Sequence, residues 1–60
     1  MYPYHVRIME DIPSKVVVRW CSENAIHDFD ICYEEAQGLR VTVLCFDFKE
    51  SQVLAILRWV

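Results

Sequence analysis

The sequence predicts an α+β fold whose five elements follow one another in the order strand, helix, strand, strand, helix. Residues 2–9 and 28–35 alternate between apolar and polar side chains, which is the period of a half-buried strand. Residues 12–24 and 47–60 instead repeat apolar side chains at helical spacing. A length of 60 residues, with 55% hydrophobic side chains and one glycine, indicates a single folded domain over residues 1–60.

The first strand is predicted over residues 2–9. One side of this strand would carry Tyr2, Tyr4, Val6 and Ile8, and the other side His5, Arg7 and Met9.

A helix is predicted to follow, with Asp11 as its N-cap and Asn24 near its end. Pro13 fits the first turn, because the N–H that proline lacks has no partner there. The side chains at helical spacing are Ile12, Val16, Val17, Trp20 and Cys21. Three consecutive valines at 16–18 favour a strand, since β-branched side chains lose rotamer freedom in a helix. A strand over 15–21 in a meander is therefore the alternative.

The middle of the sequence predicts a β-hairpin. Residues 28–35 form one strand, Ala36-Gln37-Gly38 supplies the turn, and the apolar run 39–48 forms the other strand. A loop of two residues would pair Phe29 with Phe46, Ile31 with Leu44 and Tyr33 with Thr42, whereas a three-residue loop would exchange the two faces. We expect the two-residue loop, because it gathers on one face the large side chains Phe29, Ile31, Leu44, Phe46 and Phe48.

The last helix is predicted to begin with the capping box Asp47-x-x-Glu50. Its buried stripe is expected to contain Val53, Ile56, Leu57 and Val60, with Leu54 at the margin. Trp59 falls off this stripe, so we expect it at the rim of the helix, either as an edge filler or as a contact surface.

This order of elements resembles a ferredoxin-like domain that lacks its last strand. The resemblance implies a three-stranded antiparallel sheet of order 2-3-1, two helices on one face, and a free edge on the first strand. Proteins cover such an edge, charge it or use it for pairing.

The expected register leaves one face of the sheet without helices. The residues on this face would be His5, Arg7, Met9, Asp30, Cys32, Glu34, Val41, Val43 and Cys45. An apolar centre with a charged rim is typical of a protein interface. The expected partner-binding residues are therefore these, apart from Cys45, together with Trp59.

Composition excludes several classes of function. A net charge of −3 argues against direct binding to nucleic acid. No apolar run approaches the ~18 residues of a membrane span, and the beginning of the sequence lacks the pattern of a secretory signal. We therefore expect a cytoplasmic protein without a membrane partner.

The three cysteines do not form a recognisable site. Cys21, His27, Cys32 and Cys45 lack the close C-x2-4-C pair of structural zinc sites. The sequence also lacks a phosphate-binding loop and a nucleophile motif. We expect no catalytic residues, no metal and no cofactor. The alternative is a ligand-sensing, thiol-redox or metal-binding module that uses Cys32, Cys45 and His5.

The ending FDFKESQVLAILRW, residues 46–59, resembles the strand-to-helix endings of short proteins from tailed bacteriophages and covers about a quarter of the chain. The resemblance implies a stoichiometric binder, such as a regulator or inhibitor of a host protein in the host cytoplasm. We thus expect a small non-enzymatic interaction module that binds a larger protein, a second copy of itself, or both. It would act through the uncovered sheet face and the edge of the first strand.

Overall fold

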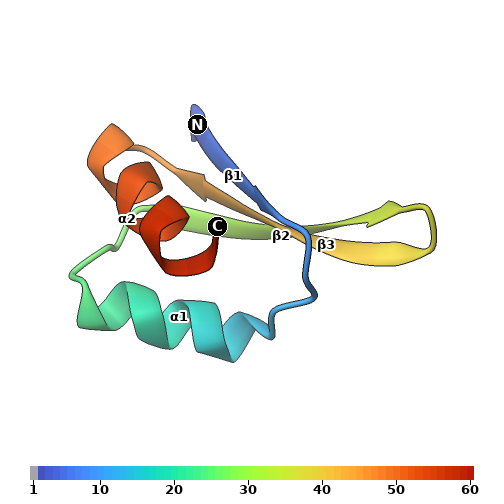
Figure 1. The fold of residues 1–60 in the computed structure, drawn as a ribbon. Helices are drawn as coiled ribbons and strands as arrows, with labels where there is room; N and C mark the ends of the chain where they lie inside the picture. Colours follow the sequence, from blue (N-terminus) through green and yellow to red (C-terminus); the bar gives the residue numbers. More distant parts are fainter. Residues whose placement is uncertain (1) are drawn as a thin grey trace.

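A computed structural model describes residues 2–60 and shows an α+β domain built on one antiparallel sheet (Figure 1). The elements in chain order are β1 (Tyr4–Ile8), α1 (Ser14–Glu23), β2 (Phe29–Ala36), β3 (Leu39–Phe46) and α2 (Lys49–Trp59). Strand β3 lies between β1 and β2 and pairs antiparallel with both. The predicted fold class and sheet order are confirmed, and α1 is a helix rather than the alternative strand.

The turn between β2 and β3 has the predicted two-residue loop. Gln37 and Gly38 have φ angles of 54° and 79°, and a type I′ hairpin turn requires positive φ at both central positions. Ala36 consequently lies opposite Leu39. The expected register is confirmed, with the pairs Phe29–Phe46, Ile31–Leu44 and Tyr33–Thr42.

The main core lies between the sheet and the two helices, which cover the same face (Figure 1). It consists of Val6, Ile8, Ile12, Val17, Cys21, Ile26, Leu44, Phe46 and Ala55. Trp20 of α1 and Trp59 of α2 pack edge to face, with ring centroids 4.8 Å apart. The tryptophan pair therefore connects the two helices directly. Val16, which was expected at the same spacing as the core residues, is exposed.

Helix α1 begins later than predicted, after Pro13. The carbonyl of Pro13 accepts the N–H of Val16 at 3.0 Å, and no side chain caps the helix. A residue that precedes proline is disfavoured in the helical region, so Ile12 cannot start the helix and Asp11 cannot be its N-cap. The predicted Asp11 cap is therefore wrong, and the Asp11 carboxylate instead lies 3.6 Å from the guanidinium of Arg40.

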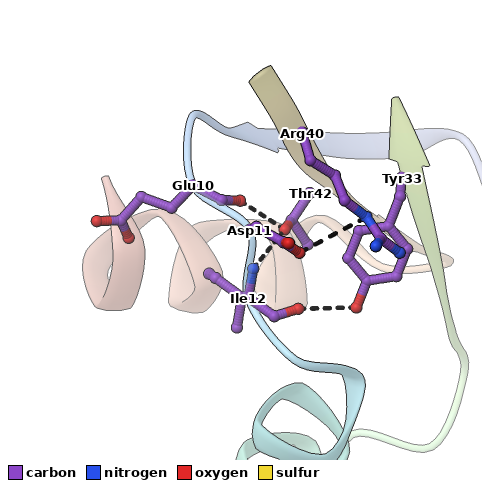
Figure 2. Close-up of polar contacts among 6 residues, drawn as sticks. All are labelled: Glu10, Asp11, Ile12, Tyr33, Arg40 and Thr42. Carbon is purple, nitrogen blue, oxygen red and sulfur yellow. Dashed lines mark hydrogen bonds and ion pairs between the residues drawn. The ribbon is translucent and has the colours of Figure 1, made fainter. Parts of the chain in front are cut away.

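Side-chain hydroxyls hold the connection between β1 and α1 against the hairpin (Figure 2). The hydroxyl of Thr42 accepts the N–H of Ile12 at 2.9 Å and donates to the carbonyl of Glu10 at 2.6 Å. The hydroxyl of Tyr33 donates to the carbonyl of Ile12 at 2.7 Å, and the guanidinium of Arg40 lies 4.1 Å from the centre of the Tyr33 ring. These bonds satisfy backbone groups beyond the end of β1 and thereby fix where α1 begins.

Strand β1 is shorter than predicted at both ends. Pro3 lacks the N–H needed to extend a strand ladder, and β1 begins only at Tyr4. Tyr2 was expected on the same side as Tyr4. It instead packs against a second cluster on the other face of the sheet. Met9 follows the last strand residue, Ile8, and is exposed.

Helix α2 also begins one residue later than predicted. Its N-cap is Phe48, without a side-chain cap, so Glu50 occupies the second helical position rather than the third. The predicted Asp47–Glu50 capping box is therefore wrong. Strand β3 ends at Phe46, and Phe48 is exposed instead of joining the core as expected.

Replacing the hydroxyl of Thr42 tests the polar cluster of Figure 2. Thr42→Val keeps the buried shape but leaves the N–H of Ile12 without its partner, so we expect a loss of about 1–3 kcal/mol in the free energy of unfolding. Thr42→Ser keeps the hydroxyl and loses one methyl group, for an expected loss of about 0.8 kcal/mol. Denaturant unfolding measures both values. A Thr42→Val protein as stable as the wild type would show that the hydroxyl is dispensable.

Candidate interaction surfaces

The register brings the predicted partner-binding strand residues together on the sheet surface opposite the helices. His5 and Arg7 of β1 lie opposite Cys45 and Val43 of β3, and β2 adds its own residues from the other side. We call this surface the open face and define it as His5, Arg7, Asp30, Cys32, Glu34, Val41, Val43 and Cys45. Met9 lies outside it, because β1 ends before this residue.

The apolar centre of the open face is already covered by the chain itself. Val41, Val43 and Cys45 are only 0%, 7% and 8% exposed, although no helix lies over them. Tyr2 and Ala36 pack against these three residues. The sequence correctly indicated an apolar centre with a charged rim, but the exposed part of the open face is mainly the rim.

An ion pair spans the open face from one edge strand to the other. The guanidinium of Arg7 on β1 lies 3.1 Å from the carboxylate of Glu34 on β2, and β3 runs between these strands. Since Arg7 is opposite Val43 and Glu34 is opposite Val41, the two long side chains pass over these valines. Both charged groups remain about half exposed, so the pair contributes at most about 1 kcal/mol of electrostatic stabilisation.

The open face also brings together the residues of the thiol alternative, but their contacts do not form an activated nucleophile. His5 and Asp30 lie opposite Cys45 from its two sides. The Nε2 atom of His5 donates to the carbonyl of Tyr2 at 2.7 Å, while the Cys32 thiol lies 3.8 Å from the Asp30 carboxylate. A thiol nucleophile needs a base in hydrogen-bond reach. The imidazole of His5 is directed to the backbone instead, and the Cys32 thiol faces only the Asp30 carboxylate, which is a weaker base than imidazole.

Burial makes two of the three thiols poor nucleophiles. Burial raises the pKa of Cys21 to about 11. Burial also raises the pKa of Cys45, and the neighbouring Cys32 thiol and the carboxylates of Asp30 and Glu34 add to that increase. Cys32, in contrast, is exposed. Within residues 2–60, no group of three or more His, Cys, Asp or Glu side chains is placed to hold a metal ion.

More of the exposed aliphatic side chains lie along α2 than on the sheet. Ala55 is the residue of α2 that is buried against the core, whereas the predicted buried stripe faces outward. We call this surface the outer face of α2. It consists of Val53, Leu54, Ile56, Leu57 and Val60, whose exposed fractions range from 41% to 79%. The predicted inward orientation of this helix is therefore wrong.

The contacts of α2 explain this orientation. Ala55 is small enough for the helix to approach β1 and β3 closely. Gln52 donates from its side-chain amide to the carbonyl of His5 at 3.0 Å, and Trp59 reaches Trp20. The five consecutive apolar residues at 53–57 are distributed around the whole helix, so their spacing alone did not identify the buried side.

Two further predictions concerned Trp59 and the edge of β1. Trp59, expected at the rim as an edge filler or contact residue, is half-buried and packs beside Trp20. The first strand forms one edge of the sheet as predicted, but its His5 carbonyl already accepts the hydrogen bond from Gln52.

Comparisons of the chain with protein-family models, with curated proteins and with solved structures found no significant match. Neither α1 nor α2 combines the length and the apolar character that crossing a membrane requires. The functional argument therefore depends on the surfaces described above.

The three thiols should differ in their rates of alkylation. With iodoacetamide at pH 8, Cys32 should react first because it is exposed, and Cys21 should react on the order of 100-fold more slowly than a free thiol because its pKa is raised. The rate at Cys21 should continue to rise between pH 9 and pH 11, as the thiolate forms. Mass spectrometry of peptides at timed intervals measures each site, and unfolded protein, with three similar rates, is the control. Fast alkylation of Cys45 in the folded protein would contradict this assignment.

Proposed function

We propose that the chain is a small non-enzymatic protein–protein interaction module that acts through the outer face of α2. The exposure of this face is the observation that carries the proposal. A helix on the surface of a domain normally turns its apolar stripe towards the core. In α2 the single buried residue is Ala55, while Leu57 is 77% exposed.

Exposing these apolar side chains to water is unfavourable, so burying them against a partner would lower the free energy. Burying one Val, Leu or Ile side chain contributes roughly 1.5–3 kcal/mol, and the outer face holds five such residues with two-fifths or more of their surface exposed. Lys49 and Glu50 lie beside the apolar residues at the start of the helix, and Arg58 lies near its end. An apolar centre bordered by charges is typical of protein interfaces.

The open face supports docking less strongly than the outer face of α2. Its apolar centre is covered by Tyr2 and by the Arg7–Glu34 ion pair, so a partner would meet mainly polar groups. His5, Arg7, Asp30, Cys32 and Glu34 are nevertheless exposed and remain proposed secondary contacts. Val41 and Val43 would contribute by supporting this surface from below.

A thiol-sensing function of Cys32, Cys45 and His5 is the second candidate. The register supports it by bringing all three residues onto one face. The raised pKa of Cys45 and the hydrogen bond of His5 to Tyr2 weigh against it, because neither favours a thiolate. Interaction through α2 is therefore the function that the geometry supports best.

The biological role that we propose is that of a stoichiometric regulator. A binding module without chemistry of its own acts by occupying the surface of another protein or by bringing copies together. The resemblance of residues 46–59 to short tailed-bacteriophage proteins covers all of α2. It extends the proposal to a regulator or inhibitor of a host protein, acting in the host cytoplasm.

Photocrosslinking in the native cells tests the proposed surface. Leu57 is replaced by p-benzoylphenylalanine, and the same replacement at Leu39, a 62% exposed leucine beside the hairpin turn, is the matched control. We expect a covalent adduct with a protein from position 57 and none from position 39. A third replacement at Cys32 samples the open face. No adduct at position 57, or adducts only at Cys32, would contradict the proposal.

A further inference from the structure

The outer face of α2 contains both a projecting apolar side chain and a depression that is partly lined by apolar residues. A shallow depression of about 430 Å³ is lined by Lys49, Glu50, Val53 and Leu54. Leu57 projects from the next turn of the same face and is 77% exposed. Four residues on neighbouring turns form the type of hole that a side chain from a facing helix fills. The outer face of α2 therefore has the side chain and the hole that packing against the same face of a second chain requires.

The charges of α2 select the relative direction of two such helices. The first turn carries the basic Lys49 and the acidic Glu50, and the last turn carries the basic Arg58. Glu50 and Arg58 each lie four residues from Leu54. Two antiparallel helices that cross at Leu54 bring Glu50 of each chain to the level of Arg58 of the other. A parallel pair would instead align like charges. Antiparallel packing also places the helix dipoles in opposite directions, which is favourable.

The apolar area is sufficient for a dimer of ordinary size. The exposed fractions of the outer face correspond to roughly 400–500 Å² of apolar surface, within the range of patches that commonly serve as interaction sites. Homodimer interfaces are about 65% apolar, so complete burial of this area would give an interface of at most roughly 700 Å² per chain, near the ~800 Å² of a standard interface.

We propose that a second copy of this chain occupies the outer face of α2. The two α2 helices pack antiparallel about a two-fold axis near Leu54, and each Leu57 enters the depression lined by Lys49, Glu50, Val53 and Leu54 of the other copy. This arrangement uses the same patch on both chains, as a two-fold interface requires. The inference rests on the proposed function, because it names the occupant of that surface.

Sedimentation velocity over a range of concentrations tests the dimer. The wild-type chain should shift from monomer to dimer between low and high micromolar concentration. Leu57→Asp should raise the dissociation constant at least about 100-fold, because each interface loses two buried leucines and gains two charges. Leu39→Asp should leave the constant unchanged. Circular dichroism checks that both variants remain folded, which the high exposure of both leucines permits.

Charge reversal tests the antiparallel direction. Glu50→Arg and Arg58→Glu should each weaken the dimer about tenfold, because each places like charges opposite one another twice in the symmetric pair. The double variant Glu50→Arg with Arg58→Glu should recover most of the affinity. No recovery, with both single variants folded, would overturn the antiparallel arrangement.

The outcomes separate this inference from the proposed function. A wild-type chain that stays monomeric to several hundred micromolar overturns the dimer. If position 57 still crosslinks to a different protein in cells, the interaction function remains and only its partner changes. If position 57 crosslinks to nothing and the chain is monomeric, both proposals fail.

Discussion

The structure depends first on the two-residue turn at Gln37-Gly38. Its two positive φ angles fix the pairing of β2 with β3, and that pairing assigns every side chain of the hairpin to one face of the sheet. Leu44 and Phe46 therefore point to the helices, and Val41, Val43 and Cys45 point away. The same register presents Thr42 and Tyr33 to the β1–α1 connection, so the position of α1 follows from a turn far from it along the chain.

Both faces of the central strand are closed, but by different means. Two helices cover one face and bury the large side chains there. On the other face a tyrosine and an ion pair between the edge strands cover three smaller side chains. A domain of this size exposes much of its surface, so closing the second face with long polar side chains leaves the sheet without a large apolar patch. Five of the remaining exposed apolar side chains lie together on the outer face of α2.

Much of the fold follows from local patterns in the sequence. Alternation in 28–35 and the turn residues at 37–38 left two registers open. The requirement that the large side chains Phe29, Ile31, Leu44 and Phe46 share one face selected the correct one. The three valines at 16–18 left α1 ambiguous, and core packing by Val17 decides for the helix. The N-caps predicted at Asp11 and Asp47 were wrong for different reasons. The restriction on the residue before Pro13 delays the start of α1, and α2 begins only after Phe48, beyond the end of β3 at Phe46.

The orientation of α2 could not be predicted from spacing, because apolar residues lie on nearly all sides of the helix. Tertiary contacts of Ala55, Gln52 and Trp59 determine which side faces the core. The proposed interaction depends on this orientation.

Methyl NOE measurements on dilute protein test the orientation of α2 most directly. The methyl group of Ala55 should show contacts with side chains of β1 and β3, and the methyl groups of Leu57 should show none within the chain. Contacts from Leu57 to Leu44 or Phe46 would contradict the account, because they would place the aliphatic face of α2 in the core.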